Sequence, residues 1–133
     1  MLPASVIEVS EDVFAVCDRL RHADLSAARG LRYLDSYAFS RCGGLRQVLL
    51  NEGLETIRLG CFFDNRIERI TFPHTLRCIG DKAFLYCRRL KQVCLAETAL
   101  ESIGASAFAS SGLESFVAPP SLRTIGESVF SDC

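Results

Sequence analysis

A unit of about 23 residues recurs along the whole chain. Its clearest copy covers residues 67–87 and fits the template L-x-x-I-x-L-P-x-x-L-x-x-I-G-x-x-A-F-x-x-C. The aromatic residue of the A-F pair, which we call the anchor, recurs every 22 to 25 residues: Phe14, Phe39, Phe62, Phe84, Phe108 and Phe130. A fixed period of about 20–30 residues is typical of a solenoid. Because one unit cannot bury its own apolar residues, we expect stacked copies to bury Leu on Leu and Phe on Phe.

Each unit contains two short apolar segments. LRQVLL, residues 45–50, predicts a strand, and LRCI, residues 76–79, predicts a second and shorter one. Between the second segment and the next first segment lies GDKAFLYC, which predicts one helical or 3-10 turn after a glycine bend. We therefore expect an α/β repeat solenoid, rich in β-structure, with two short strands and a helical or 3-10 turn per repeat.

The length of 133 residues fits one domain, and 49% hydrophobic against 23% charged residues argues against disorder. We predict a single domain over residues 1–133 with about 5.5 repeats. The opening LPASV and the closing VFSDC both match the middle of the template, and neither resembles a polar capping repeat. We therefore expect a slice of a longer array, or self-association that covers uncapped ends.

Charge and cysteine content restrict the classes of partner. The net charge of −1 predicts no general attraction to nucleic acid or anionic lipid, and no uncharged run is long enough for membrane insertion. No signal peptide is apparent, and the seven cysteines form no C-x-x-C pair. These features favour reduced thiols and a cytoplasmic location.

The sequence predicts no catalytic, cofactor-binding or metal-binding residues. Cysteine stands three residues after four anchors, where Asn65 and Ser111 occupy the same slot: Cys17, Cys42, Cys87 and Cys133. This mixture indicates a buried, weakly polar slot that satisfies a turn carbonyl or amide, and a shared metal site is the alternative. His22, Asp24 and Ser26 permit a triad, but any nearby serine would do so, and solvent-facing strand residues are the better interpretation.

Charges alternate in sign at one position of the second segment: Arg32, Glu55, Arg77, Glu101 and Arg123. In-register stacking would place opposite charges side by side and disfavour a slipped register. A charged docking stripe is the alternative interpretation.

Two stretches, LRCIGDKAFLYCRRLKQVCL and LRTIGESVFSDC, resemble the BspA-like leucine-rich repeats, also called the Treponema pallidum type. The resemblance covers residues 2–133. It implies a curved right-handed superhelix with a parallel sheet on its concave face, no cofactor, and protein binding or adhesion in place of catalysis. It also makes the cell surface the alternative location.

The outward positions of the first segments are the candidate concave, protein-binding face: His22, Asp24, Gln47, Leu49, Arg69, Thr71, Gln92, Cys94, Ser115 and Val117. This set is poor in the Tyr, Trp and Arg side chains that dominate binding energies, so the site is weak or lies elsewhere in a parent array. Tyr33 and Tyr37 on the opposite side are a second candidate patch. We predict a non-enzymatic scaffold with a protein partner, the alternative being structural spacer repeats of a larger surface protein.

Overall fold

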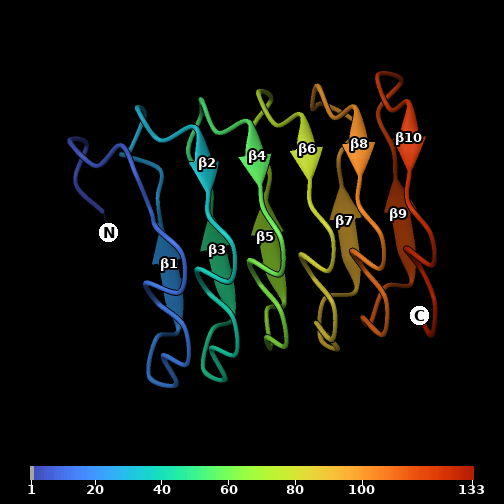
Figure 1. Ribbon diagram of the computed structural model, residues 1–133, viewed down its shortest axis with the longest axis horizontal. Coiled ribbons are helices and arrows are strands. Elements are labelled where there is room, and N and C mark those ends of the chain that lie inside the picture. Colours follow the sequence, from blue (N-terminus) through green and yellow to red (C-terminus); the bar gives the residue numbers. More distant parts are fainter. Residues whose placement is uncertain (1) are drawn as a thin grey trace.

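In the computed structural model, which describes residues 2–133, ten short strands stack into a repeat solenoid (Figure 1). The strands of the first segments are β1 (His22–Asp24), β3 (Gln47–Leu49), β5 (Arg69–Thr71), β7 (Gln92–Cys94) and β9 (Ser115–Val117). Those of the second segments are β2 (Tyr33–Leu34), β4 (Thr56–Ile57), β6 (Cys78–Ile79), β8 (Ser102–Ile103) and β10 (Thr124–Ile125). The predicted repeat solenoid with two strands per unit is therefore confirmed.

The two kinds of strand form two layers that run in opposite directions in Figure 1. The short second strands make one continuous parallel sheet in the order β10-β8-β6-β4-β2. The first strands are also parallel but divide into the sheets β1-β3-β5 and β7-β9. We refer to one full turn of the chain as a rung.

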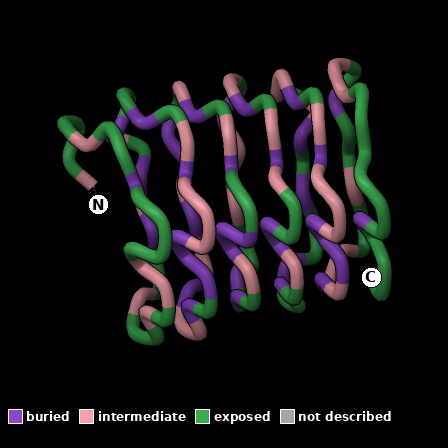
Figure 2. The backbone as a smooth tube through the Cα atoms, in the orientation of Figure 1, coloured by how far each residue is buried: buried purple, intermediate pink, exposed green. Residues whose placement is uncertain are grey.

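Matched apolar columns fill the space between the two layers. Neighbouring anchor rings lie 5.1 to 6.2 Å apart between centroids and are stacked within 20° of parallel. The four central anchors are fully buried, and buried positions repeat at the same place on successive rungs (Figure 2). Each buried Leu or Phe column contributes hydrophobic stabilisation that a single rung could not provide.

The predicted helical or 3-10 turn is wrong, because residues 2–133 contain no helix. Each anchor is flanked, two residues before and two residues after, by a residue in the left-handed conformation: at Phe84 these are Lys82 (φ 56°) and Tyr86 (φ 64°). Such residues interrupt a right-handed helix. The anchor amides instead bond between rungs, as from Phe84 N to the Ala107 carbonyl at 2.7 Å. The A-F segments are therefore consecutive turns that continue the ladder between rungs.

The predicted polar slot ties the turns at Cys42, Asn65, Cys87 and Cys133 to the preceding rung, whereas the Ser111 hydroxyl contacts the Cys133 thiol of the next rung at 3.4 Å. The Cys87 thiol donates to the carbonyl of Phe62 at 3.1 Å, and Asn65 Nδ2 donates to the carbonyl of Phe39 at 2.7 Å. The bends at the other end of the rungs carry similar ties that the sequence did not reveal. Thr75 Oγ1, for example, donates to the Leu54 carbonyl at 2.8 Å.

The second-strand sheet stays in register because eight residues separate the start of every second segment from its anchor. The backbone bonds recur accordingly, as from Arg77 N to the Glu55 carbonyl and from Glu101 N to the Arg77 carbonyl, both at 2.8 Å. The turn that follows the anchor varies in length, being one residue shorter after Phe62 and Phe108 than after the other anchors that precede a first strand. The first-strand sheet divides where the short turn after Phe62 is followed by the longer turn after Phe84.

Candidate protein-binding face

The ten residues predicted for binding lie together on the outward side of the first strands, which we call the first-strand face. Register aligns them in two columns, with His22, Gln47 and Arg69 in one and Gln92 beside Ser115 further along it. The second column aligns Asp24, Leu49 and Thr71 before the division of the sheet and Cys94 beside Val117 after it. All ten are exposed or half-buried, while the residues between them on each strand point inward. Their role in binding remains a prediction.

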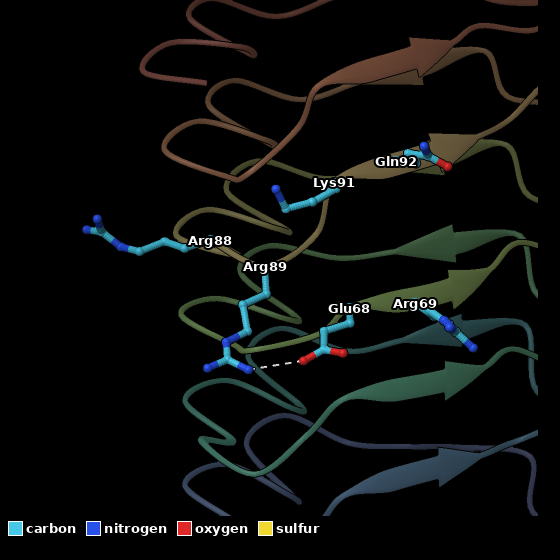
Figure 3. Close-up of a pocket in the computed structure, with 6 residues that line it drawn as sticks. All are labelled: Glu68, Arg69, Arg88, Arg89, Lys91 and Gln92. Atoms are coloured by element: carbon cyan, nitrogen blue, oxygen red, sulfur yellow. Dashed lines mark hydrogen bonds and ion pairs between the residues drawn. The ribbon is translucent and has the colours of Figure 1, made fainter.

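A hollow of about 450 Å³ opens on this face where β5 and β7 meet (Figure 3). Its lining comes from two rungs: Glu68, Arg69, Arg88, Arg89, Lys91 and Gln92. β5 and β7 lie side by side but share no ladder pairing (Figure 1). The hollow therefore coincides with the break in the first-strand sheet.

The break is visible in one missing backbone bond. Glu68 N donates to the Arg46 carbonyl at 2.8 Å, and Glu114 N donates to the Lys91 carbonyl at 2.9 Å. The equivalent bond from Lys91 N to the Glu68 carbonyl does not form, although both residues belong to the described part of the chain. The same two rungs remain bonded on either side of the break. Asp64 N donates to the Leu85 carbonyl in the turns that precede the first strands, and Ala99 N donates to the His74 carbonyl in the bends that follow them.

Positive charge collects around the hollow. A second hollow of about 410 Å³ on the adjoining turns shares Arg88 and Arg89 and adds Asp64, Asn65, Arg66 and Tyr86. Together the two linings hold five basic and two acidic side chains, a net charge of +3 in a chain whose total is −1. Arg88, Arg89 and Lys91 are already close in the sequence, and stacking adds Arg66 and Arg69 from the preceding rung.

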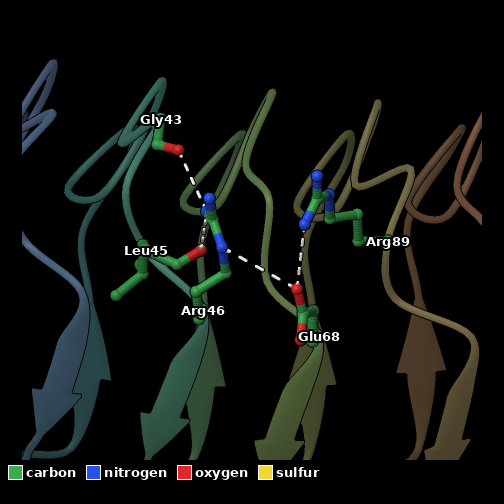
Figure 4. Close-up of polar contacts among 5 residues, drawn as sticks. All are labelled: Gly43, Leu45, Arg46, Glu68 and Arg89. Atoms are coloured by element: carbon green, nitrogen blue, oxygen red, sulfur yellow. Dashed lines mark hydrogen bonds and ion pairs between the residues drawn. The ribbon is translucent and has the colours of Figure 1, made fainter.

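Some of these charges are paired and others are not. Glu68 Oε1 lies 3.7 Å from Arg46 Nε and 3.1 Å from Arg89, so it joins three rungs (Figure 4). Lys91 Nζ pairs with Glu114 at 2.6 Å. Three arginines of the two linings make no ion pair within residues 2–133: Arg66, Arg69 and Arg88.

The charge column predicted on the second segments is in register, but its ion pairs mostly do not form. Among its neighbours in residues 2–133, only Arg77 and Glu101 come within ion-pair distance, at 3.4 Å. Arg32 instead donates to the Gly53 carbonyl at 3.1 Å. Exposed pairs of this kind contribute only about 0–1 kcal/mol, so side-chain entropy easily prevents them from forming.

The family model for the BspA type leucine rich repeat region matches residues 7–133 with six copies. The chain belongs to the BspA-type leucine-rich-repeat family. A search of curated proteins found no match for it.

Solved leucine-rich-repeat structures share the fold of this BspA-type chain. A leucine-rich-repeat protein from Bacteroides ovatus is 27% identical with a TM-score of 0.79, over 99% of this chain and 34% of that one. The Treponema pallidum leucine-rich-repeat protein is 25% identical with a TM-score of 0.72, over 96% of this chain and 70% of that one. The pneumococcal vaccine antigen PcpA is 25% identical with a TM-score of 0.70, over 84% of this chain and 27% of that one. The chain thus spans about a third or less of the length of the Bacteroides and pneumococcal proteins.

The triad interpretation finds no support in the geometry of this BspA-type chain. Asp24 accepts hydrogen bonds from the backbone N–H and hydroxyl of Ser26 at 3.0 and 2.6 Å, and the hydroxyl bond lowers the pKa of the Asp24 carboxyl. Within residues 2–133, no hydrogen bond joins His22 to either residue. The same part of the chain has no cluster of His, Cys, Asp and Glu that could hold a metal ion. It also contains no helix long and apolar enough to cross a membrane.

The second candidate patch, Tyr33 and Tyr37, is largely occupied by neighbouring side chains. The Arg58 guanidinium lies 3.9 Å from the centre of the Tyr33 ring and also pairs with Asp35 at 3.2 Å. The Tyr37 ring covers Gly60 of the next rung, where an added Cβ would lie 2.3 Å from Tyr37 Cε1. Both tyrosines are half-buried and serve packing between rungs.

Proposed function

We propose that this chain is a non-enzymatic scaffold that binds a protein partner through its first-strand face. The single observation that carries the proposal is the hollow at the break between β5 and β7, which interrupts an otherwise repetitive face. Binding energy concentrates in a few side chains at concave places, and Arg is among the residues that dominate it. Membership of a generally non-enzymatic repeat family supports the same class of function.

The face also has the chemistry of a protein-binding surface. After Asp24, the second column is uncharged at Leu49, Thr71, Cys94 and Val117, while the column through Arg69 and Gln92 is polar. Such a mixture of a less polar strip with a polar rim is typical of transient interfaces. A spacer would have no need for an unpaired arginine beside a hollow, which favours binding over the purely structural alternative.

A pull-down tests this proposal. The bait is the whole chain, compared with the double variant Arg69→Ala/Gln92→Ala and with Arg123→Ala/Thr124→Ala, an exposed pair on the opposite sheet. We expect the first variant to lose a partner that wild type and the matched control both retain. Equal recovery of every protein by all three baits would refute a role for the first-strand face. Far-ultraviolet circular dichroism confirms that each bait is folded.

A further inference from the structure

The unpaired arginines around the hollow indicate what kind of partner fits it. Arg69 projects from β5, and Arg88 comes from the turn that precedes β7. Neither side chain makes an ion pair within residues 2–133. The carboxylates of Glu68 and Glu114 pair with other basic side chains of the same region. Glu68 and Glu114 are therefore already engaged by Arg46, Arg89 and Lys91, while Asp64 on the adjoining turn makes no ion pair within residues 2–133.

We propose that the hollow between β5 and β7 binds an extended acidic segment of a protein partner, with Arg69 and Arg88 receiving its carboxylates. This inference rests on the proposed function and specifies the partner of the same face. A guanidinium presents a planar fork of N–H donors that matches a carboxylate in a two-bond arrangement. Two such forks on neighbouring rungs would select a segment with more than one carboxylate.

The arrangement of the two arginines favours an extended segment over a single small anion. In the view of Figure 3, Arg88 and Arg69 lie at opposite ends of the lining, with Arg89, Glu68 and Lys91 between them, and the Arg88 side chain extends away from the others. One carboxylate or phosphate group cannot contact both guanidinium groups across that lining. A peptide in an extended conformation spans about 3.3 Å per residue, so successive acidic side chains can engage both sides.

The surroundings of the hollow add a second requirement on the segment. Thr71 and Cys94 lie on the same strands as Arg69 and Gln92, two residues further on, and both are exposed and uncharged. Val117 continues this column and is 47% exposed. In an extended segment, successive side chains point to opposite sides. If its acidic side chains face the arginines of the turns, the side chains between them lie over this uncharged column, where small apolar groups fit.

Nucleic acid fits the same surface less well. A nucleic-acid site neutralises a row of phosphates along a basic stripe, and the chain as a whole carries a charge of −1. The unpaired arginines are confined to adjoining rungs, and Glu68, Asp64 and Glu114 interrupt the positive region on each side. A short acidic segment needs only this local charge.

Fluorescence anisotropy with defined probes tests the inference. The probes are a labelled peptide of alternating Glu and Val, the same peptide with Gln in place of Glu, and single-stranded oligothymidine with the same number of charges. The proteins are wild type, Arg69→Glu/Arg88→Glu, and the control Arg19→Glu/Arg29→Glu, which makes the same charge change at exposed positions on other rungs. Arg69→Gln/Arg88→Gln is the substitute if charge reversal prevents folding.

We expect wild type to bind the acidic peptide at low salt, more weakly as salt increases, and to bind the Gln peptide far less. Reversal at Arg69 and Arg88 should weaken binding roughly tenfold or more, and the control should change it about twofold at most. An equal loss in both variants would show a general charge effect and overturn the inference. Tighter binding of oligothymidine, with the same dependence on Arg69 and Arg88, would overturn it in favour of nucleic acid.

The two proposals fail separately. If no acidic peptide binds but Arg69→Ala/Gln92→Ala still loses its partner in the pull-down, the acidic-segment inference is overturned and the binding face stands. If the peptide binds wild type and loses affinity on charge reversal, the inference is supported directly, whatever the pull-down recovers.

Discussion

The two sheets of this solenoid are built from the same rungs, yet one is continuous and the other is divided. The second-strand sheet pairs all five of its strands, while the first-strand sheet stops at β5 and starts again at β7. The segment that carries each second strand has a constant length up to its anchor, whereas the turn before each first strand varies by one residue. The break coincides with the one step at which a shorter turn is followed by a longer one, whereas the opposite change leaves β3 paired with β5 and β7 paired with β9.

The difference shows how a regular repeat acquires a distinct site. The interior columns continue across the break, since the Phe62 and Phe84 rings stack at 5.2 Å and Phe84 and Phe108 at 5.1 Å. Only the backbone ladder of the first-strand sheet is interrupted, between β5 and β7. The hollow with its net positive lining lies at that interruption. The packed core and the proposed binding hollow thus lie in different layers of the same rung.

The largest expected effect tests whether the interior is as well packed at the break as away from it. Phe84→Ala should lower the free energy of unfolding by about 3–5 kcal/mol, because it removes a fully buried ring from a packed column. Phe39→Ala, on a rung within the intact part of both sheets, should cost a similar amount. Denaturant unfolding measures both. A loss below about 1 kcal/mol at Phe84 alone would mean that the break extends into the core.

A smaller effect is expected from the short turn that precedes β5. Asn65→Ala removes the donor to the buried Phe39 carbonyl and should lower the free energy of unfolding by about 1–3 kcal/mol. Asn65→Ser preserves a hydroxyl donor and should recover part of the loss. If Asn65→Ala is neutral in denaturant unfolding, the slot does not hold the short turn in place.

The long turn that precedes β7 can be tested through its buried thiol. Burial raises the pKa of the Cys87 thiol to about 12, so the folded state keeps a proton that the unfolded state releases above about pH 9. This contribution to stability is complete below the unfolded-state pKa and is lost as pH rises. Between pH 8 and pH 10, wild type should lose about 1–2 kcal/mol more than Cys87→Ser, which cannot ionise. Equal losses in denaturant unfolding would indicate that the long turn opens to solvent.

The smallest expected effect lies in the broken ladder itself. The Lys91 amide should exchange its hydrogen roughly tenfold or more faster than the Glu68 and Glu114 amides, corrected for local sequence, because it lacks their backbone acceptor. Amide hydrogen exchange followed by nuclear magnetic resonance measures the three sites in one sample. Removal of Arg89 would give this turn the length of the one after Phe62 and should slow Lys91 exchange. Equal protection of all three amides in wild type would contradict the break.

Much of the fold and part of the site were accessible from the pattern of residues. The anchors, the two strands per unit, the shared Cys and Asn slot and the outward side of the first strands all depend on spacing along the chain, and spacing is visible in the sequence. The turn conformation was missed because left-handed residues such as Lys82 and Tyr86 carry no recognisable signal: Gly60 is the only glycine among the equivalent positions. The ion pair of Glu68 with Arg89 was missed because it joins the residue before β5 to a turn of another rung.

The sequence by itself determined that the chain repeats, which side chains stack inside it, and to which family it belongs. These properties follow from a period that every rung satisfies with similar residues. Only the tertiary structure decided that the first-strand sheet breaks between β5 and β7 and that basic residues from neighbouring rungs gather there. The physical reason is that stacking places residues about 20 positions apart within one strand spacing of roughly 4.8 Å, so a change in one turn alters the neighbours of a whole rung.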